Sequence, residues 1–153
     1  MLPEPDATNA TALRVGASAL IRDARGRILL QRRSDNGRWG LPGGSVEIGE
    51  AVMAAVVREV REETGLAVCV DRLVGVYSDP AFQVVRYADG NVVHYVSLFF
   101  ACSVLGGTLH TVADAETLEL AFFPPAELPS DLLPLHRIRI QDALADRAAA
   151  FIR

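Results

Sequence analysis

Three glutamates, Glu59, Glu62 and Glu63, have the spacing in this sequence that most clearly suggests chemistry. On a helix, positions i, i+3 and i+4 share one face, so the three carboxylates would project from an arc of about 100°. Like charges held this close repel one another, and a bound cation would relieve that repulsion. Oxygen ligands on a rigid element suit Mg²⁺, which accepts substrate phosphates as further ligands, and Mn²⁺ is the alternative ion.

A solvated acidic face is the competing interpretation, with Arg58 and Arg61 as partial partners, and for such glutamates taken alone it is the commoner one. The residues before the cluster favour the metal site instead. Glu50 and the pair Gly43-Gly44 precede it, which places a loop of permissive backbone before an acidic helix. Glycine has no side chain in the way, so such a loop can bring a backbone carbonyl close to a metal.

Residues 44–66, GSVEIGEAVMAAVVREVREETGL, resemble a complete Nudix box. The box reads Gly, five residues, Glu, seven residues, then Arg-Glu-apolar-any-Glu-Glu-any-Gly-apolar. With seven identities at roughly one in fifteen each, a chance match at a given position is on the order of one in 10⁸. The fixed positions are filled by Gly44, Glu50, Arg58, Glu59, Val60, Glu62, Glu63, Gly65 and Leu66.

The Nudix resemblance implies an α/β fold, an α/β/α sandwich with a mixed β-sheet, over nearly the whole chain. It also implies that the three glutamates hold the metal and that the Gly43 carbonyl joins them. Arg58 would orient a neighbouring glutamate through charge-assisted hydrogen bonds. Supporting roles at the loop and the helix ends would fall to Gly44, Glu50 and Gly65.

The reaction implied is hydrolysis of a phosphoanhydride by water attack at phosphorus. It needs cations bridging the phosphate oxygens and a deprotonated water. The substrate would be a nucleoside diphosphate linked to another group: a nucleotide sugar, an ADP-ribose-like molecule, a CDP-alcohol or a nucleoside triphosphate. Glu59 or Glu62, beside Arg58, is the expected base. Glu119 precedes an aromatic pair in a segment similar to one in the family, and it is either a further catalytic candidate or an exposed strand-edge charge.

Residues that could choose the substrate lie outside the box. The arginines of residues 32–38 could reach phosphates or be ordinary surface charge, and Trp39 could stack on a base or pack beneath the glycine loop. The segment Tyr77–Tyr95 is rich in aromatics and is expected to form a substrate pocket or a dimer contact. The expected substrate contacts are Arg32, Arg38, Trp39, Tyr77, Phe82 and Arg86.

The elements that must position these residues can be predicted from periodicity and turn signals. A helix is expected over Glu50–Thr64, with Gly65 as its C-cap, and a terminal helix over Leu132–Phe151. Runs at 15–22 and 27–33, separated by Asp-Ala-Arg-Gly, predict a β-hairpin. Further strands are expected at 67–76, 92–104 and 118–123.

Length and composition restrict the possible partners. The 153 residues suit one domain, expected at 13–153 after a flexible tail at 1–12 that lacks the features of a signal peptide. A net charge of −4 argues against sequence-independent binding of nucleic acid. The expected protein is therefore cytoplasmic, makes no membrane contact and binds a small nucleotide; a homodimer would suit the family.

Three other functions compete with the hydrolase on the same scaffold. A non-catalytic nucleotide sensor would have no need of all three glutamates. An RNA 5′-end pyrophosphohydrolase would want a basic groove, which the acidic balance disfavours. An isomerase would want an altered box and extra length, and neither is found.

Overall fold

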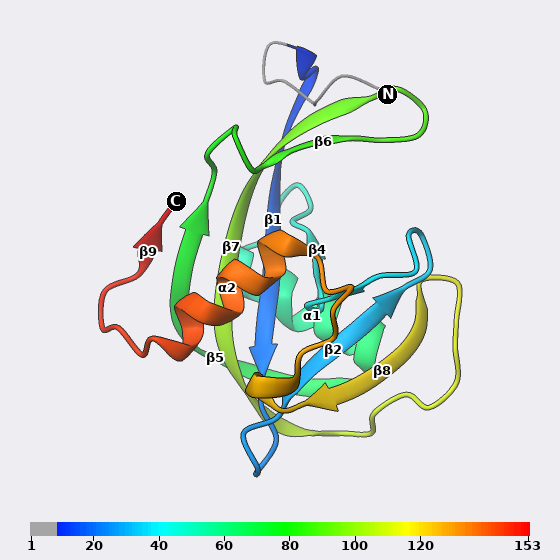
Figure 1. The fold of residues 1–153 in the computed structure, drawn as a ribbon, viewed down its shortest axis with the longest axis vertical. Helices are drawn as coiled ribbons and strands as arrows, with labels where there is room; N and C mark the ends of the chain where they lie inside the picture. The colour runs from blue at the N-terminus through cyan, green and yellow to red at the C-terminus, as the bar shows by residue number, and fades with distance from the viewer. Residues whose placement is uncertain (1–8) are drawn as a thin grey trace.

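The computed structural model describes residues 9–153 as two β-sheets with two α-helices (Figure 1). The strands are β1 (Ala12–Ile21), β2 (Ile28–Arg33), β3 (Trp39–Gly40), β4 (Gly43–Ser45), β5 (Leu66–Tyr77), β6 (Val84–Arg86), β7 (Val92–Gly107), β8 (Thr117–Phe123) and β9 (Phe151–Ile152). The helices are α1 (Val52–Thr64) and α2 (Pro134–Leu144), with a short 3₁₀ turn at Pro125–Glu127. Residues 1–8, most of the expected tail, lie outside the described residues.

The larger sheet is mixed, as the Nudix resemblance implies. Its order is β4-β1-β7-β5-β9, and β6 pairs with β7 beside this path. β1 runs parallel to β7, whereas β4, β5 and β6 are antiparallel to their neighbours β1 and β7. The smaller sheet has the order β3-β2-β8 and is antiparallel.

The predicted hairpin of 15–22 and 27–33 is wrong beyond its turn. The Asp23 carboxylate accepts hydrogen bonds from the backbone N–H groups of Arg25 and Arg27, both at 2.9 Å, which fixes the turn. Only the bridge between Arg22 and Ile28 joins the two strands there. β1, which precedes the turn, lies between β4 and β7 in the larger sheet. β2, which follows the turn, belongs to the smaller sheet. Apolar patterning shows which face of a strand is buried, but it does not show which other strands pair with that strand.

Helix α1 begins two residues later than expected. Glu50 lies instead in the loop before it, where its N–H donates to the Glu47 carbonyl at 3.0 Å. Ala55, Val56 and Val60 are buried against the sheet. Gly65 ends the helix in the left-handed conformation (φ 82°), as predicted.

The predicted terminal helix over Leu132–Phe151 is too long. α2 ends at Leu144, and Asp146 takes a positive φ of 50° that turns the chain back. Phe151 and Ile152 then pair in parallel with Gly75 and Val76 of β5. This pairing satisfies backbone groups on an otherwise open sheet edge, which a longer helix would leave uncovered.

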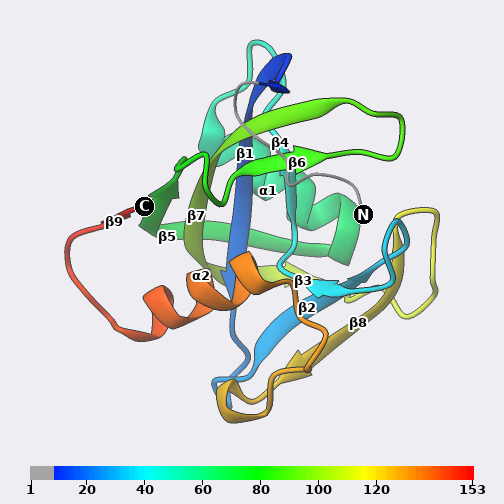
Figure 2. The ribbon, with the colours of Figure 1, turned by 45° about the horizontal axis from the view of Figure 1, so that its top comes forward.

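The helices α1 and α2 lie on opposite faces of the larger sheet (Figure 2), and a hydrophobic core lies under each of them. Alternate residues of β1 divide between them: Ala19 and Ile21 pack in the core with α1, and Leu20 packs in the core with α2. The α/β/α sandwich follows from this alternation. Neither α1 nor α2, nor the short 3₁₀ turn, has the length and hydropathy of a membrane-spanning helix, which holds for all of residues 9–153.

Candidate active site

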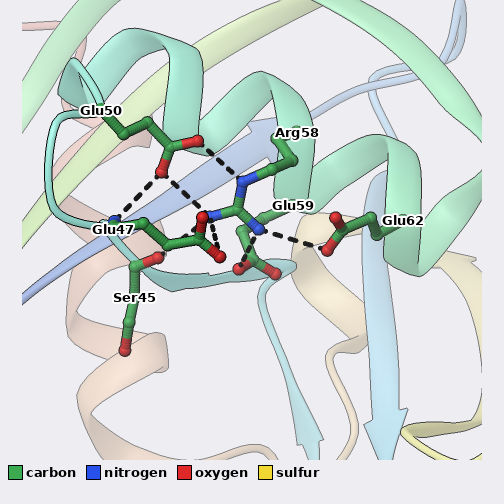
Figure 3. Close-up of polar contacts among 6 residues, drawn as sticks. All are labelled: Ser45, Glu47, Glu50, Arg58, Glu59 and Glu62. Atoms are coloured by element: carbon green, nitrogen blue, oxygen red, sulfur yellow. Dashed lines mark hydrogen bonds and ion pairs between the residues drawn. The ribbon is translucent and has the colours of Figure 1, made fainter.

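Arg58 lies at the centre of an ion-pair network on α1 (Figure 3). Its Nε and Nη2 atoms donate to both carboxylate oxygens of Glu50, at 2.7 and 3.0 Å. Its Nη1 atom donates to Glu59 at 2.9 Å and to Glu62 at 3.2 Å. A further bond from Nη2 to the Ser45 carbonyl, at 3.1 Å, reaches β4. One guanidinium therefore joins two residues of the helix to the strand and loop before it.

Glu50 also connects the loop before α1 to the helix. Its carboxylate accepts the backbone N–H of Glu47 at 3.1 Å in addition to the two bonds from Arg58. Those Arg58 bonds hold the pKa of Glu50 below its usual value. A permanently charged bidentate pair of this kind is a directional clamp, and it suits the supporting role expected of Glu50.

Glu63 is the most deeply buried of the three box glutamates. Its exposed fraction is 5%, and its Oε2 atom has no hydrogen-bond partner among residues 9–153. Burial, together with the neighbouring Glu59 carboxyl, raises the pKa of Glu63 to about 9. Two carboxyls brought together away from water are costly when both are charged and no cation lies between them.

The glycines before the helix allow the loop to approach these carboxyls. A Cβ atom at Gly44 would lie 2.5 Å from the carboxyl carbon of Glu59, so a side chain there would displace the glutamate. The backbone of Gly43 acts on the Glu63 carboxyl as well, where it opposes the rise in pKa. The structure thus brings together Gly43, Gly44, Glu59 and Glu63, which are 20 or fewer positions apart in the sequence.

The donor set fits a divalent cation. It combines carboxylate oxygens on a rigid helix with a nearby backbone loop, and one buried oxygen is unpartnered. Glu59 and Glu62 are turned toward Arg58, so within residues 9–153 no three acidic, histidine or cysteine side chains form a ready ligand set. Glu59, Glu62 and Glu63 are the side chains that could hold the ion.

A cavity of about 290 Å³, named here the acidic cavity, opens beside the end of α1. Glu63 from α1 and Glu119 from β8 both line it, together with Asp114 and His110. Glu119 is exposed and lies opposite Arg32 in the strand register. The fold therefore places Glu119 on the same cavity as a box glutamate, although the two are 56 positions apart in the sequence.

A second, larger cavity of about 530 Å³, named here the central cavity, lies at the glycine loop. Residues 43–45 form part of its wall. Arg33 and the buried side chains of Gln83, Ser97 and Arg139 also line it. Its volume falls in the range of about 300–1,000 Å³ that is usual for small-molecule sites.

The six expected substrate contacts do not meet in the central cavity. Arg32 donates to the Gly37 carbonyl at 3.1 Å, and Arg38 donates to the Asp131 carbonyl at 3.3 Å. Trp39 is buried in the core with α2, with its ring edge-on to Phe123 at a centroid distance of 5.0 Å.

The other three lie around the β5 and β6 ends. Tyr77 and Phe82 line a separate cavity of about 310 Å³ that also includes Arg153. Arg86 is half-buried on β6, and its Nε atom has no partner among residues 9–153.

Sequence patterns did not single out Gln83, Ser97 or Arg139. One signal was present for Arg139, which stands four positions after Leu135 and four before Ala143. An arginine at an apolar position of the helical period is unusual and predicts a buried charge.

Comparisons with known proteins agree with this geometry. The sequence model of the NUDIX domain matches residues 12–145. A MutT-like protein of Streptomyces ambofaciens is 34% identical over 148 residues, 97% of this chain and 87% of that protein. An ADP-ribose pyrophosphatase of Methanocaldococcus jannaschii is 45% identical over 106 residues, 67% of this chain and 57% of that protein.

The fold has a close counterpart among solved structures as well. A UDP-X diphosphatase superposes with a TM-score of 0.74 at 26% identity, covering 96% of this chain and 70% of that one. The family match spans both the glycine loop and the acidic face of α1. The chain belongs to the Nudix hydrolase family.

Proposed function

We propose that this chain is a Mg²⁺-dependent hydrolase that cleaves a phosphoanhydride bond in a nucleoside diphosphate linked to another group, with Mn²⁺ as a substitute ion. The main support is the Glu63 carboxyl, buried beside Glu59 under the glycine loop with one oxygen unpartnered. On a solvated acidic face the carboxyls would stay in contact with water, because burying one without a hydrogen-bond partner costs free energy.

The substrate is proposed at the level of a class. Nudix hydrolases generally use divalent metal ions and act on small nucleotide-derived substrates. The relatives differ in what their names say they cleave, ADP-ribose in one case and UDP-linked groups in another. A nucleotide sugar, an ADP-ribose-like molecule, a CDP-alcohol and a nucleoside triphosphate are the candidates.

The bound ion, the glutamates and Arg58 have different proposed roles in the reaction. When bound, Mg²⁺ supplies charge neutralisation at the phosphate oxygens and makes a coordinated water easier to deprotonate. Glu59 or Glu62 accepts the proton of the attacking water, and Arg58, within 3.2 Å of both, holds their carboxylates in place. Glu119 is the third candidate base, because it shares the acidic cavity with Glu63.

The test is hydrolysis of a panel containing the four candidate classes, with and without Mg²⁺. The Glu62→Gln, Glu63→Gln double variant preserves side-chain size while removing two of the carboxyl groups proposed to hold the ion, so it should fold and lose at least about 100-fold in kcat/KM. Glu127→Gln, on the exposed 3₁₀ turn, is the control and should keep full activity. If nucleotides raise the melting temperature but no compound is hydrolysed, the hydrolase proposal is rejected and a non-catalytic nucleotide sensor takes its place.

A further inference from the structure

Arg139 is a buried cation whose presence the fold does not explain. Its exposed fraction is 6%, and no ion pair joins it to an acidic side chain among residues 9–153. Its Nε atom has no hydrogen-bond partner there, and its guanidinium lies over the Tyr77 ring at 5.3 Å from the centroid. Burial lowers the pKa of Arg139 to about 10. An apolar side chain of similar volume would be less costly at this position.

Two neighbouring side chains leave this region rich in hydrogen-bond donors. Gln83 is 4% exposed, and its Oε1 atom accepts from Ser97 Oγ at 3.1 Å and from Arg139 Nη2 at 3.4 Å. Its amide nitrogen therefore remains a donor, and the buried Nε–H of Arg139 is a second donor without a partner among residues 9–153. Gln83, Ser97 and Arg139 are named here the donor floor of the central cavity, which all three line.

The donor floor and the glycine loop border the same cavity. Tyr87 and Tyr95, whose hydroxyls bond to each other, supply aromatic surface to its wall, and Leu133 and Leu135 supply apolar surface. A nucleotide with its phosphates at the glycine loop, as the proposed function requires, would extend its base into this cavity. A planar ring suits the aromatic and apolar wall, and its polar edge would face the donors.

We infer that the donor floor recognises the O6/N7 edge of a 6-oxopurine, the base class of guanine and hypoxanthine; this rests on the proposed function for the position of the phosphates. That edge presents two adjacent acceptors, which match the donor fork of a guanidinium. Adenine presents an N6 donor at the same place, and cytosine an N4 donor, each of which would face another donor. Arg139 is thus assigned as a specificity-determining residue.

The test measures binding of GMP, IMP and AMP to the full-length chain in EDTA by calorimetry. GMP and IMP should bind at least about tenfold more tightly than AMP, as expected for one bidentate pair. IMP lacks the 2-amino group of GMP, so equal binding of the two isolates the O6/N7 edge. Equal affinity for AMP, weak binding of IMP beside tight binding of GMP, or no binding of any of the three would overturn the assignment.

Variants identify the residue responsible. Arg139→Met should fold and reduce the GMP to AMP affinity ratio to about one, and Arg139→Lys should lose most of the ratio because an ammonium has no fork. Arg137→Met, two residues away with its guanidinium on the Pro129 carbonyl at 2.9 Å, is the matched control and should keep the ratio. An unchanged ratio in either Arg139 variant would show that the arginine is only structural.

Failure of this inference is distinguishable from failure of the proposed function, because monophosphates contain no phosphoanhydride bond. A preference for GMP and IMP without hydrolysis of any diphosphate would reject the hydrolase and keep the base assignment. Mg²⁺-dependent hydrolysis with equal affinity for the three monophosphates would keep the hydrolase and reject the base assignment.

Discussion

Arg58 decides how the carboxylates of α1 are presented. It makes five hydrogen bonds, to Glu50, Glu59, Glu62 and the Ser45 carbonyl. A planar guanidinium can serve several acceptors at fixed angles, whereas a lysine ammonium is a compact point charge on a flexible stem. Charge alone would therefore not replace this residue.

Arg58→Lys should weaken divalent-metal affinity by about 10- to 100-fold, as is typical when a residue that orients metal ligands is lost. The measurement is a Mn²⁺ titration followed by electron paramagnetic resonance. Arg61→Lys is the control, because Arg61 lies on the same helix and is exposed. Unaltered Mn²⁺ affinity in Arg58→Lys would mean that the network does not position metal ligands.

His136 provides a pH-dependent contribution to stability. Its Nδ1 atom accepts the Leu41 backbone N–H at 2.8 Å, which requires the neutral ring. Burial, and then the positive charges of Arg139 and Arg33 that face it, hold the pKa of His136 well below 6.5. Below the unfolded pKa the unfolded chain binds more protons than the folded protein. This contribution is therefore complete above about pH 6.5 and is lost as the pH falls.

The free energy of unfolding should accordingly fall between pH 7 and pH 5, by up to about 1.4 kcal/mol per pH unit for this one proton. Urea unfolding at a series of pH values measures the slope. His136→Gln should flatten it, and His110→Gln, at an exposed position, should leave it as it is. Equal slopes in wild type and His136→Gln would refute the assignment.

Spacing along a single helix was enough to predict that Glu59, Glu62 and Glu63 share a face, because helical geometry depends only on local sequence. The donor floor could not be predicted in this way. Gln83 and Arg139 are 56 positions apart, and only the packing of α2 on the sheet brings them together.

At the scale of elements, Gly65 sets both the end of α1 and the start of β5. Its φ of 82° is left-handed, and a Cβ atom there would collide with the Thr108 carbonyl. Gly65→Ala should therefore lose about 1–2 kcal/mol of unfolding free energy from the backbone conformation alone, and more from the collision. Denaturant unfolding measures the loss.

Gly26→Ala is the matched control for Gly65→Ala. Gly26 has a similar φ of 76°, and a Cβ atom there would meet nothing within 4 Å. It should show the conformational cost without the collision. Equal losses in the two variants would mean that the Thr108 contact relaxes freely.

Element types were easier to predict than element partners. The strand runs and α1 follow from β-branched and helical periodicity, and the turn at Asp23 was also correct. The separation of β1 and β2 into different sheets was missed, as was the pairing of Phe151 and Ile152 with β5. Those pairings depend on which edges the rest of the fold leaves open, and local sequence does not encode this.

At the scale of the whole molecule, the larger sheet joins the two cores. Side chains of β1 alternate between them, and β7 does the same: Phe100 packs with the α1 core and Phe99 with the α2 core. A strand cannot lose its packing on one face and keep it on the other, because both faces depend on the same backbone hydrogen bonds. The molecule should therefore unfold as one cooperative unit.

Ile21→Val and Ile140→Val test this cooperativity with identical chemistry in the two cores. Both isoleucines are fully buried, Ile21 with α1 and Ile140 on α2. Each variant should lose about 0.5–1.5 kcal/mol of unfolding free energy. The double variant should lose the sum to within about 0.5 kcal/mol, because the residues share no cluster. Fluorescence and far-ultraviolet circular dichroism should report a single coincident urea transition in all three proteins. Two separated transitions in either single variant would show instead that the cores unfold independently and that the shared sheet does not couple them.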